Sequence, residues 1–234
     1  MEYLLELRHM TPNSIRDFQV GYFPQNARYR LGPSDPAELI QLKGRFVVPI
    51  FSEFGKIVGI AGRIPNPSEK GWWNTKFKKG SHLYGFNFAR KRIFEENKAY
   101  VFEGYMDRIV MAQHGLDNCV AAMSTNLGIR RIGLLARYCN RFCLCFDTDH
   151  NEAGFAGMLR TLADMYSVGI GVSPSNWEVT AIMLPVGVDP DDYVHEHGME
   201  AFLALEKPLS ENQLKESGRA LKELEFRLKQ KRKA

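Results

Sequence analysis

Residues 99–107 read AYVFEGYMD, an apolar run that leads into two carboxylates across a short turn. Two later stretches have the same form: residues 141–149 read RFCLCFDTD, and residues 178–192 read EVTAIMLPVGVDPDD. Continuous apolar runs of this length are typical of buried strands. Carboxylates gathered at strand ends supply the oxygen ligands that Mg²⁺ prefers. The three stretches therefore predict a divalent-metal site of the kind used in phosphoryl or nucleotidyl transfer.

Strands and helices are expected to alternate from residue 98 onward. This alternation favours an α/β fold with a parallel-rich sheet flanked by helices. Ligands of such sheets bind beyond the carboxyl ends of the strands, where Glu103, Asp147 and Asp149 fall. The expected strands are 99–102, 118–123, 141–146 and 177–184, and the expected helices are 105–114, 129–138, 151–167 and 199–206.

The first 97 residues have a different pattern, which predicts a mixed α+β unit. Thr11 followed by Pro12 predicts the start of a short helix. Residues 45–51 and 56–63 are expected to form a hairpin, and residues 65–82 a mobile basic loop. At the other end, leucines at helical spacing predict a charged helix. The expected domains are a basic N-terminal subdomain (1–97), a metal-binding catalytic subdomain (98–210) and a basic helical tail (211–234).

The charge is unevenly distributed along the chain. Residues 1–97 carry 15 Lys/Arg against 9 Asp/Glu, a net charge of +6. Residues 98–214 carry 8 against 15, or −7, and residues 215–234 carry 8 against 3, or +5. Basic segments on either side of an acidic one favour a polyanion held beside a metal site. The alternative is that these charges only solvate the surface.

The cysteines and the apolar runs bear on class and compartment. The four cysteines stand at 119, 139, 143 and 145, a spacing unlike that of common zinc sites. We therefore expect no zinc, and buried thiols in a reducing compartment. The chain has no apolar run that could span a bilayer, and its N-terminus does not read as a signal peptide. A cytoplasmic protein without membrane contact is expected.

Each acidic stretch also has a simpler interpretation when it is taken alone. Asp147-Thr148-Asp149 could cap the following helix, and Asp189-Pro190-Asp191 could be an ordinary turn. All three stretches, however, stand at strand ends of one βα array. Carboxylates packed together repel one another unless cations neutralise them, so their joint placement favours a metal site.

The motifs also resemble those of a known family. Residues 101–107 resemble the Glu-Gly-Tyr-Met-Asp signature of bacterial replicative primases of the DnaG type. Asp147-Thr148-Asp149 is similar to the Asp-x-Asp of their TOPRIM (topoisomerase–primase) fold, and residues 184–191 are similar to their third acidic motif. The resemblance extends over residues 5–206. It includes three motifs of the N-terminal primase subdomain, at 45–50, 59–63 and 79–85.

This resemblance implies a nucleotidyltransferase, a DNA-dependent RNA primase core that makes short primers on single-stranded DNA from ribonucleoside triphosphates. It implies that Glu103 is an essential acidic residue of catalysis, acting as a metal ligand or general base, and that Asp107, at the end of the same motif, is a second catalytic residue. It further implies two or more Mg²⁺ or Mn²⁺ ions. The implied metal ligands are Glu103, Asp147, Asp149, Asp189 and Asp191.

Basic and polar positions upstream are implied to contact nucleic acid or nucleotide. Phosphate contacts require cations without base preference. The positions that match the family, together with the lysines beside them, are Arg45, Arg63, Asn74, Lys76, Lys78 and Lys79.

The chain departs from the family pattern at its ends. Family members usually carry an N-terminal zinc-binding module and a C-terminal helicase-binding domain. We therefore expect a separate zinc module or a replicative helicase as a partner, and a compact core from a phage or mobile element, acting in the host cytoplasm, fits the pattern. Two other functions remain open: a TOPRIM-type metal-dependent nuclease, and an inactive nucleic-acid-binding scaffold.

Overall fold

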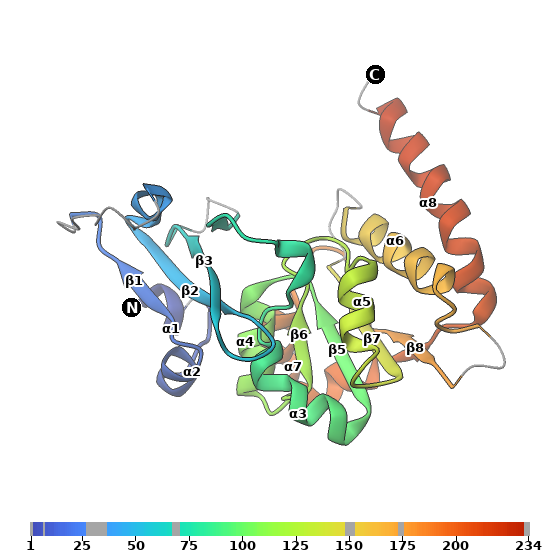
Figure 1. Ribbon diagram of the computed structural model, residues 1–234, viewed down its shortest axis with the longest axis horizontal. Coiled ribbons are helices and arrows are strands. Elements are labelled where there is room, and N and C mark those ends of the chain that lie inside the picture. The colour runs from blue at the N-terminus through green and yellow to red at the C-terminus, as the bar shows by residue number, and fades with distance from the viewer. Residues whose placement is uncertain are drawn as a thin grey trace. The chain divides into compact units, whose positions relative to one another are not determined.

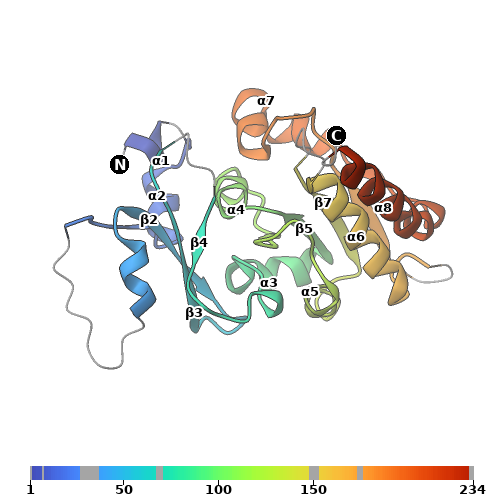
Figure 2. The same cartoon turned by 90° about the horizontal axis from the view of Figure 1, so that it is seen from above.

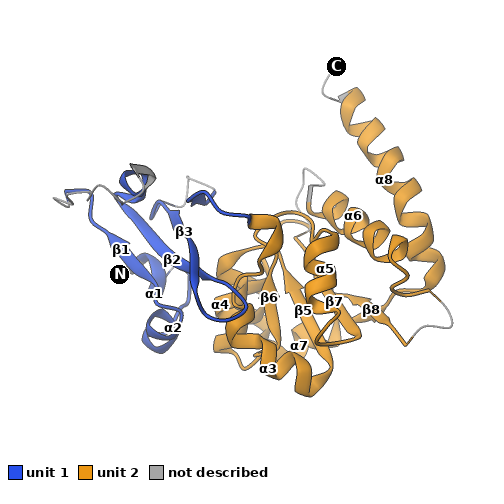
Figure 3. Ribbon diagram, viewed as in Figure 1, with its two compact units in different colours: residues 1–78 blue, residues 79–234 orange. Residues whose placement is uncertain are grey.

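A computed structural model describes residues 2–6, 8–26, 37–66, 71–147, 153–172 and 176–231. The chain forms two compact units, residues 1–78 and residues 79–234 (Figure 3). Each unit has its own sheet, and the second sheet is mostly parallel, as predicted. The division into functional domains at residues 97 and 210 stays a proposal.

The first unit is built on an antiparallel sheet with the strand order β1-β2-β3-β4. Side chains of β2 alternate between the core and the surface, with Val48 and Ile50 fully buried. This is the period expected for a sheet with one covered face. The elements are α1 (Glu2–Leu5), α2 (Pro12–Asp17), β1 (Gly21–Phe23), the 3-10 helix η1 (Ala37–Leu42), β2 (Arg45–Phe51), β3 (Ile57–Arg63) and β4 (Trp73–Asn74).

The predicted hairpin and helix start in this unit are confirmed. Ser14 N donates to Thr11 Oγ1 at 3.2 Å, and Pro12 occupies the first helical position. The prediction of a mobile loop over 65–82 is wrong for its second half. Here β4 pairs with β3, and Ile60 N donates to the buried Thr75 hydroxyl at 2.9 Å. The composition of this segment does not predict the pairing of β4 with β3. Residues 67–70 lie outside the described residues.

The second unit contains a sheet with the strand order β6-β5-β7-β8-β9 (Figure 1). Its first four strands are parallel, and β9 is an antiparallel edge strand. The chain passes from β5 to β6 on one side and then to β7 on the other, so the strand order reverses around β5. Ligands of open α/β sheets bind at such a reversal. The strands are β5 (Lys98–Phe102), β6 (Cys119–Ala121), β7 (Arg141–Cys145), β8 (Glu178–Ala181) and β9 (Lys207–Pro208).

Helices cover both faces of this sheet. Val101 and Leu144 belong to a core that includes residues of α3, α5 and α6, whereas Phe102 and Cys145 face α4 and α7. Because both faces are buried, the strands read as continuous apolar runs. Figure 2 shows α8 beside α6. The elements are the 3-10 helix η2 (Lys79–Ser81), α3 (Phe86–Glu96), α4 (Tyr105–Gln113), α5 (Ile129–Leu135), α6 (Ala153–Ser167), α7 (Pro190–Ala204) and α8 (Glu211–Lys231).

The prediction of a helix over 199–206 is wrong in its start. Helix α7 begins nine residues earlier, at Pro190, with Asp189 as its N-cap residue. The helix is kinked at Gly198, whose φ of 84° is left-handed. The signal that predicts the true start is the Asp189-Pro190 pair, because proline is favoured at the first helical position.

All four cysteines are buried thiols. Among the described residues, none of the helices combines the length and the apolar character that crossing a membrane requires.

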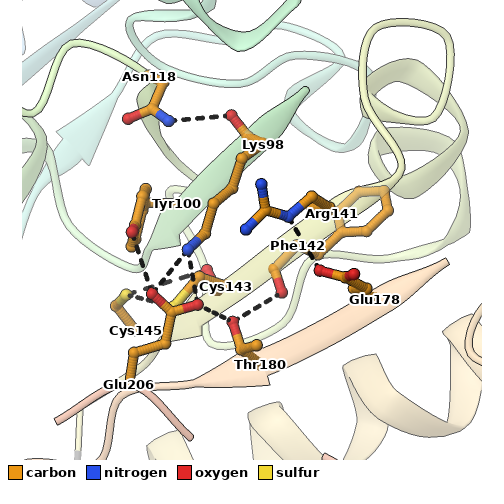
Figure 4. Close-up of polar contacts among 10 residues, drawn as sticks. All are labelled: Lys98, Tyr100, Asn118, Arg141, Phe142, Cys143, Cys145, Glu178, Thr180 and Glu206. Atoms are coloured by element: carbon orange, nitrogen blue, oxygen red, sulfur yellow. Dashed lines mark hydrogen bonds and ion pairs between the residues drawn. The ribbon is translucent and has the colours of Figure 1, made fainter. Parts of the chain in front are cut away.

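A partly buried ion pair connects the chain just after α7 to the amino ends of the strands (Figure 4). Lys98 Nζ lies 2.7 Å from both carboxylate oxygens of Glu206. The hydroxyls of Thr180 and Tyr100 donate to the same carboxylate at 2.6 and 3.0 Å. Burial alone would raise the pKa of Glu206, but the hydrogen bonds from Lys98 and Thr180 outweigh it, so the pKa is lowered.

Glu206→Gln should destabilise the fold by about 1–3 kcal/mol at pH 7, because it leaves the buried Lys98 without its charged partner. A carboxylate with a lowered folded pKa stabilises above its unfolded pKa and loses that effect as the pH falls through the folded value. The difference between variant and wild type should therefore shrink below pH 4.5, the ordinary glutamate value. Urea unfolding between pH 7 and pH 3 measures it.

Glu178→Gln is the matched control, because its ion pair with Arg141 is exposed and lies in the same sheet (Figure 4). Exposed pairs contribute about 0–1 kcal/mol. Equal destabilisation by both variants would contradict the role assigned to the Glu206 network.

Candidate metal-binding active site

Glu103 and Asp147 lie side by side at the carboxyl edge of the second sheet. They follow β5 and β7, which are adjacent parallel strands with Phe102 opposite Cys145. Asp147 N donates to Glu103 Oε1 at 3.3 Å. A Cβ atom at Gly154 of α6 would overlap the Asp147 carbonyl oxygen and crowd Glu103 Oε1. The sequence therefore places a glycine where a helix must approach these two residues closely.

Asp107 approaches the same edge from the first turn of α4. Its Oδ2 accepts a hydrogen bond from Gly104 N at 3.0 Å, so the side chain caps its own helix. The partial positive charge of a helix N-terminus favours such a carboxylate. Asp107 is only 7% exposed, which removes most of its solvation by water.

The third acidic stretch forms a compact cluster at the start of α7. One carboxylate oxygen from each of Asp189, Asp191 and Asp192 lies within 4.8 Å of the others. Asp191 is buried at 2% exposure, Asp189 is half-buried and Asp192 is exposed. The helix start turns all three side chains to one place, so the sequence expectation of an ordinary turn does not apply.

The electrostatics join these groups into one site. The pKa of Asp107 is raised well above its ordinary value, first by burial and then by the charges of Asp191, Asp147 and Asp189. The Gly104 hydrogen bond opposes this shift. Clustered carboxylates of this kind are stabilised by a cation. Because every donor is a carboxylate oxygen, the set fits Mg²⁺ or Mn²⁺ better than a soft metal.

The structure therefore brings together most of the predicted acidic residues. Glu103 contacts Asp147, and Asp107 lies in the field of Asp147, Asp189 and Asp191. Asp149 lies outside the described residues. Sequence reasoning left Asp192 out of the ligand set; the signal that could have found it is the Asp-Pro helix start, which places Asp191 and Asp192 in the first turn of the helix.

The predicted basic residues are divided between the two units. In the first unit, Arg45 Nε donates to Gln41 O at 2.8 Å and Asn74 Nδ2 donates to Trp72 O at 3.3 Å, so both side chains have structural contacts. Arg63 ends β3, and Lys76 and Lys78 are exposed.

Lys79 begins the second unit, in η2, where it is half-buried beside α5. Burial lowers the pKa of its amine, and the charge of Arg131 lowers it further. Sequence reasoning missed Arg131, a buried cation on α5. It gave no signal because one arginine in a helix normally faces solvent.

Comparison with known proteins places this architecture in a class. Residues 100–194 match the family model described as Toprim-like. The fold and the acidic edge thus define a TOPRIM domain. A DNA primase of Clostridium acetobutylicum is 34% identical over 169 residues, which are 70% of this chain and 27% of that protein. This chain thus spans about a quarter of that relative's length.

Solved structures agree with this assignment. The chain matches a structure of the DnaG catalytic core with a TM-score of 0.76 and 28% identity, covering 92% of this chain and 74% of that one. It matches a DnaG primase catalytic domain bound to single-stranded DNA with a TM-score of 0.75 and 28% identity, covering 88% and 71%. The chain has the TOPRIM catalytic core of the DnaG-type DNA primases.

Asp191→Asn should weaken Mn²⁺ binding by about tenfold or more, or about 1.4 kcal/mol, because it removes a buried charge from the cluster. In metal-free buffer the same change should raise the melting temperature, since it relieves repulsion among the carboxylates. Calorimetric titration and thermal unfolding with EDTA measure the two effects. Asp117→Asn, an exposed change before β6, is the control; equal Mn²⁺ affinity in both variants would place the cations elsewhere.

Proposed function

We propose that this chain is the RNA-polymerase core of a DNA primase, which makes short RNA primers on single-stranded DNA by metal-dependent nucleotidyl transfer. The proposal rests on the electrostatic interaction between carboxylates from all three acidic stretches, near the carboxyl ends of the strands. Asp107, from the Glu-Gly-Tyr-Met-Asp stretch, is influenced by Asp147, Asp189 and Asp191 from the two other acidic stretches. Its relatives named above are primases, and one neighbouring structure holds single-stranded DNA.

We propose that two or more Mg²⁺ or Mn²⁺ ions occupy this edge. Bound there, they would neutralise the charge of the triphosphate and of the leaving pyrophosphate. The residues that would hold them are Asp147, Asp149, Asp189 and Asp191, with Glu103 and Asp192 within the same edge.

The chain's own groups have distinct proposed tasks. The carboxylate of Glu103 would ligate a metal or accept the proton of the attacking 3′-hydroxyl. The hydrogen bond from Asp147 N orients this carboxylate. The carboxylate of Asp107 already accepts a hydrogen bond from Gly104 N. We therefore propose that Asp107 acts on Asp191 and Asp147 through its charge and does not contact substrate. Asp191 is buried, so water screens its electrostatic interactions less than those of an exposed carboxylate.

We propose that cations of the first unit and Lys79 hold the template or the nucleotide. Arg45, Arg63, Asn74, Lys76 and Lys78 lie on or beside β2, β3 and β4. Contacts from such side chains to phosphate would fix the path of the strand without reading its bases. Base selection and efficient initiation would then require a partner, such as a replicative helicase or a zinc-binding module.

One experiment separates this proposal from its alternatives. The chain is incubated with single-stranded DNA, labelled ribonucleotides and Mg²⁺ or Mn²⁺. Extended RNA products support a primase, whereas shortened template supports a TOPRIM-type nuclease. Binding of DNA without either product would support an inactive scaffold.

Glu103→Gln should reduce primer synthesis below about a tenth of the wild-type rate, a barrier increase of about 1.4 kcal/mol or more. The change removes the charge and the proton acceptor while it preserves volume. Rates of primer synthesis on equal amounts of folded protein measure the effect. Glu95→Gln on the surface of α3 is the control; equal rates for both variants would exclude Glu103 as a catalytic group.

Lys76→Ala and Lys78→Ala should each flatten the salt dependence of binding to single-stranded DNA. Each lost phosphate contact lowers the slope of log affinity against log salt by about 0.7. Both side chains are exposed, so little stability is at risk. Fluorescence anisotropy at several salt concentrations measures the slopes, with the exposed Lys56→Ala in the β2–β3 turn as control. Slopes that match the control would place the strand elsewhere.

A further inference from the structure

The loop between β6 and α5, residues 122–128, lies against the backbone of Glu103. Ala122 N donates to Phe102 O at 2.8 Å, and Met123 N donates to Glu103 O at 2.9 Å. These bonds continue the pairing of β6 with β5 beyond the end of the strand. The position of the Glu103 main chain therefore depends on the position of this loop.

The loop has a conformation that requires support. Met123 has a φ of 60°, a left-handed value that costs energy for a residue with a Cβ atom. Part of the support comes from α6. Leu127 N donates to the Thr161 hydroxyl at 3.0 Å, and a Cβ atom at Gly157 would overlap the Thr125 carbonyl oxygen. The glycine therefore allows α6 to press directly on the loop.

The rest of the support comes from Arg131 on α5. Its guanidinium donates to Ala122 O and to Leu127 O, the latter at 2.5 Å. It also donates to Ser124 Oγ at 2.9 Å and to Asn126 O at 3.0 Å. One side chain thus binds acceptors at both ends and in the middle of the loop.

Arg131 is 5% exposed, so its charge is removed from water. Burial lowers the pKa of Arg131 to about 10, which still leaves the group protonated at pH 7. A buried cation is costly unless its donors are satisfied, and here the acceptors come from the loop. The planar fork of arginine reaches several acceptors at once, which the single ammonium of lysine does not.

We propose that Arg131 is a positioning residue, which holds the 122–128 loop and through it the main chain of Glu103 in the geometry required for nucleotidyl transfer. This inference rests on the proposed primase function. It assigns a role to a residue whose hydrogen bonds go to the loop. The effect travels through the Met123–Glu103 hydrogen bond.

The test compares Arg131→Met and Arg131→Lys with the control Arg130→Met. Arg130 is the preceding residue of α5 and is exposed, so its replacement removes a charge without touching the loop. All measurements are made at a temperature where every variant is folded. They are the amide hydrogen exchange of residues 119–131, kcat and KM for primer synthesis, and the affinity for Mn²⁺.

Both Arg131 variants should accelerate exchange at the Met123 and Leu127 amides. They should also lower kcat by about tenfold, with KM for ribonucleotides nearly unchanged, the size expected for a group that orients another. Lysine should not rescue activity, because the fork and not the charge is required. Arg130→Met should behave as wild type. If Arg131→Met does not fold, the comparison of Arg131→Lys with wild type decides.

Three results would overturn the inference: unchanged exchange at Met123, faster exchange with an unchanged kcat, or full rescue by lysine. If the wild-type chain makes no primers, the proposed function fails and Mn²⁺ affinity decides the inference instead. An affinity about tenfold weaker in both Arg131 variants would then support it. An affinity equal to that of Arg130→Met would overturn it.

Discussion

The parallel pairing of β5 with β7 is the constraint on which the site depends. Because the two strands run in the same direction with Phe102 opposite Cys145, the chain leaves both at the same edge. Glu103 directly follows β5, and Asp147 follows soon after β7, so two carboxylate-bearing residues meet across 44 positions of sequence. A register shift of one residue would exchange the side chains that face the two helix layers and would separate this pair.

Bringing negative charges together has an energetic cost, and several features of the second unit offset it. The N-termini of α4 and α7 point positive partial charge at Asp107 and Asp191. The packing of α6 through Gly154 keeps the strand ends in place, even though the carboxylates repel one another. The pKa of Asp107 is raised first by burial and then by the charges of Asp191, Asp147 and Asp189, so the repulsion is not fully offset. A cation bound at this edge would relieve that repulsion and would stabilise the fold.

Helix α7 links this edge to the opposite one. It starts in the acidic cluster at Asp189, and the chain just after it carries Glu206, which is bound to Lys98 at the amino end of β5. The two ends of the helix thus have different electrostatics: repulsion at its start and a satisfied ion pair beyond its end. The ion pair of Glu206 with Lys98 thus holds the chain after α7 in place, while the carboxylates at the start of α7 repel one another.

Local sequence was sufficient for the alternation of elements and for the strand ends. Apolar runs such as 141–145 can only be buried strands or helices, and the turn residues beside them fixed their limits to within a few positions. The same reasoning placed the start of α7 nine residues too late, because it did not use the Asp189-Pro190 pair as a helix start. It also missed the pairing of β4, whose two residues are too few to show a period.

By itself, the sequence determined the α/β class, the basic and acidic segments and the positions of Glu103, Asp107, Asp147, Asp189 and Asp191 at the ends of elements. These properties follow from side-chain polarity and short-range spacing. Tertiary structure alone decided that Asp107 lies in the field of Asp147, Asp189 and Asp191, that Gly154 and Gly157 allow α6 to approach closely, and that Arg131 binds the loop beside Glu103. Such contacts join residues distant in sequence or depend on which face of a helix is buried, and a linear pattern does not record distances in space.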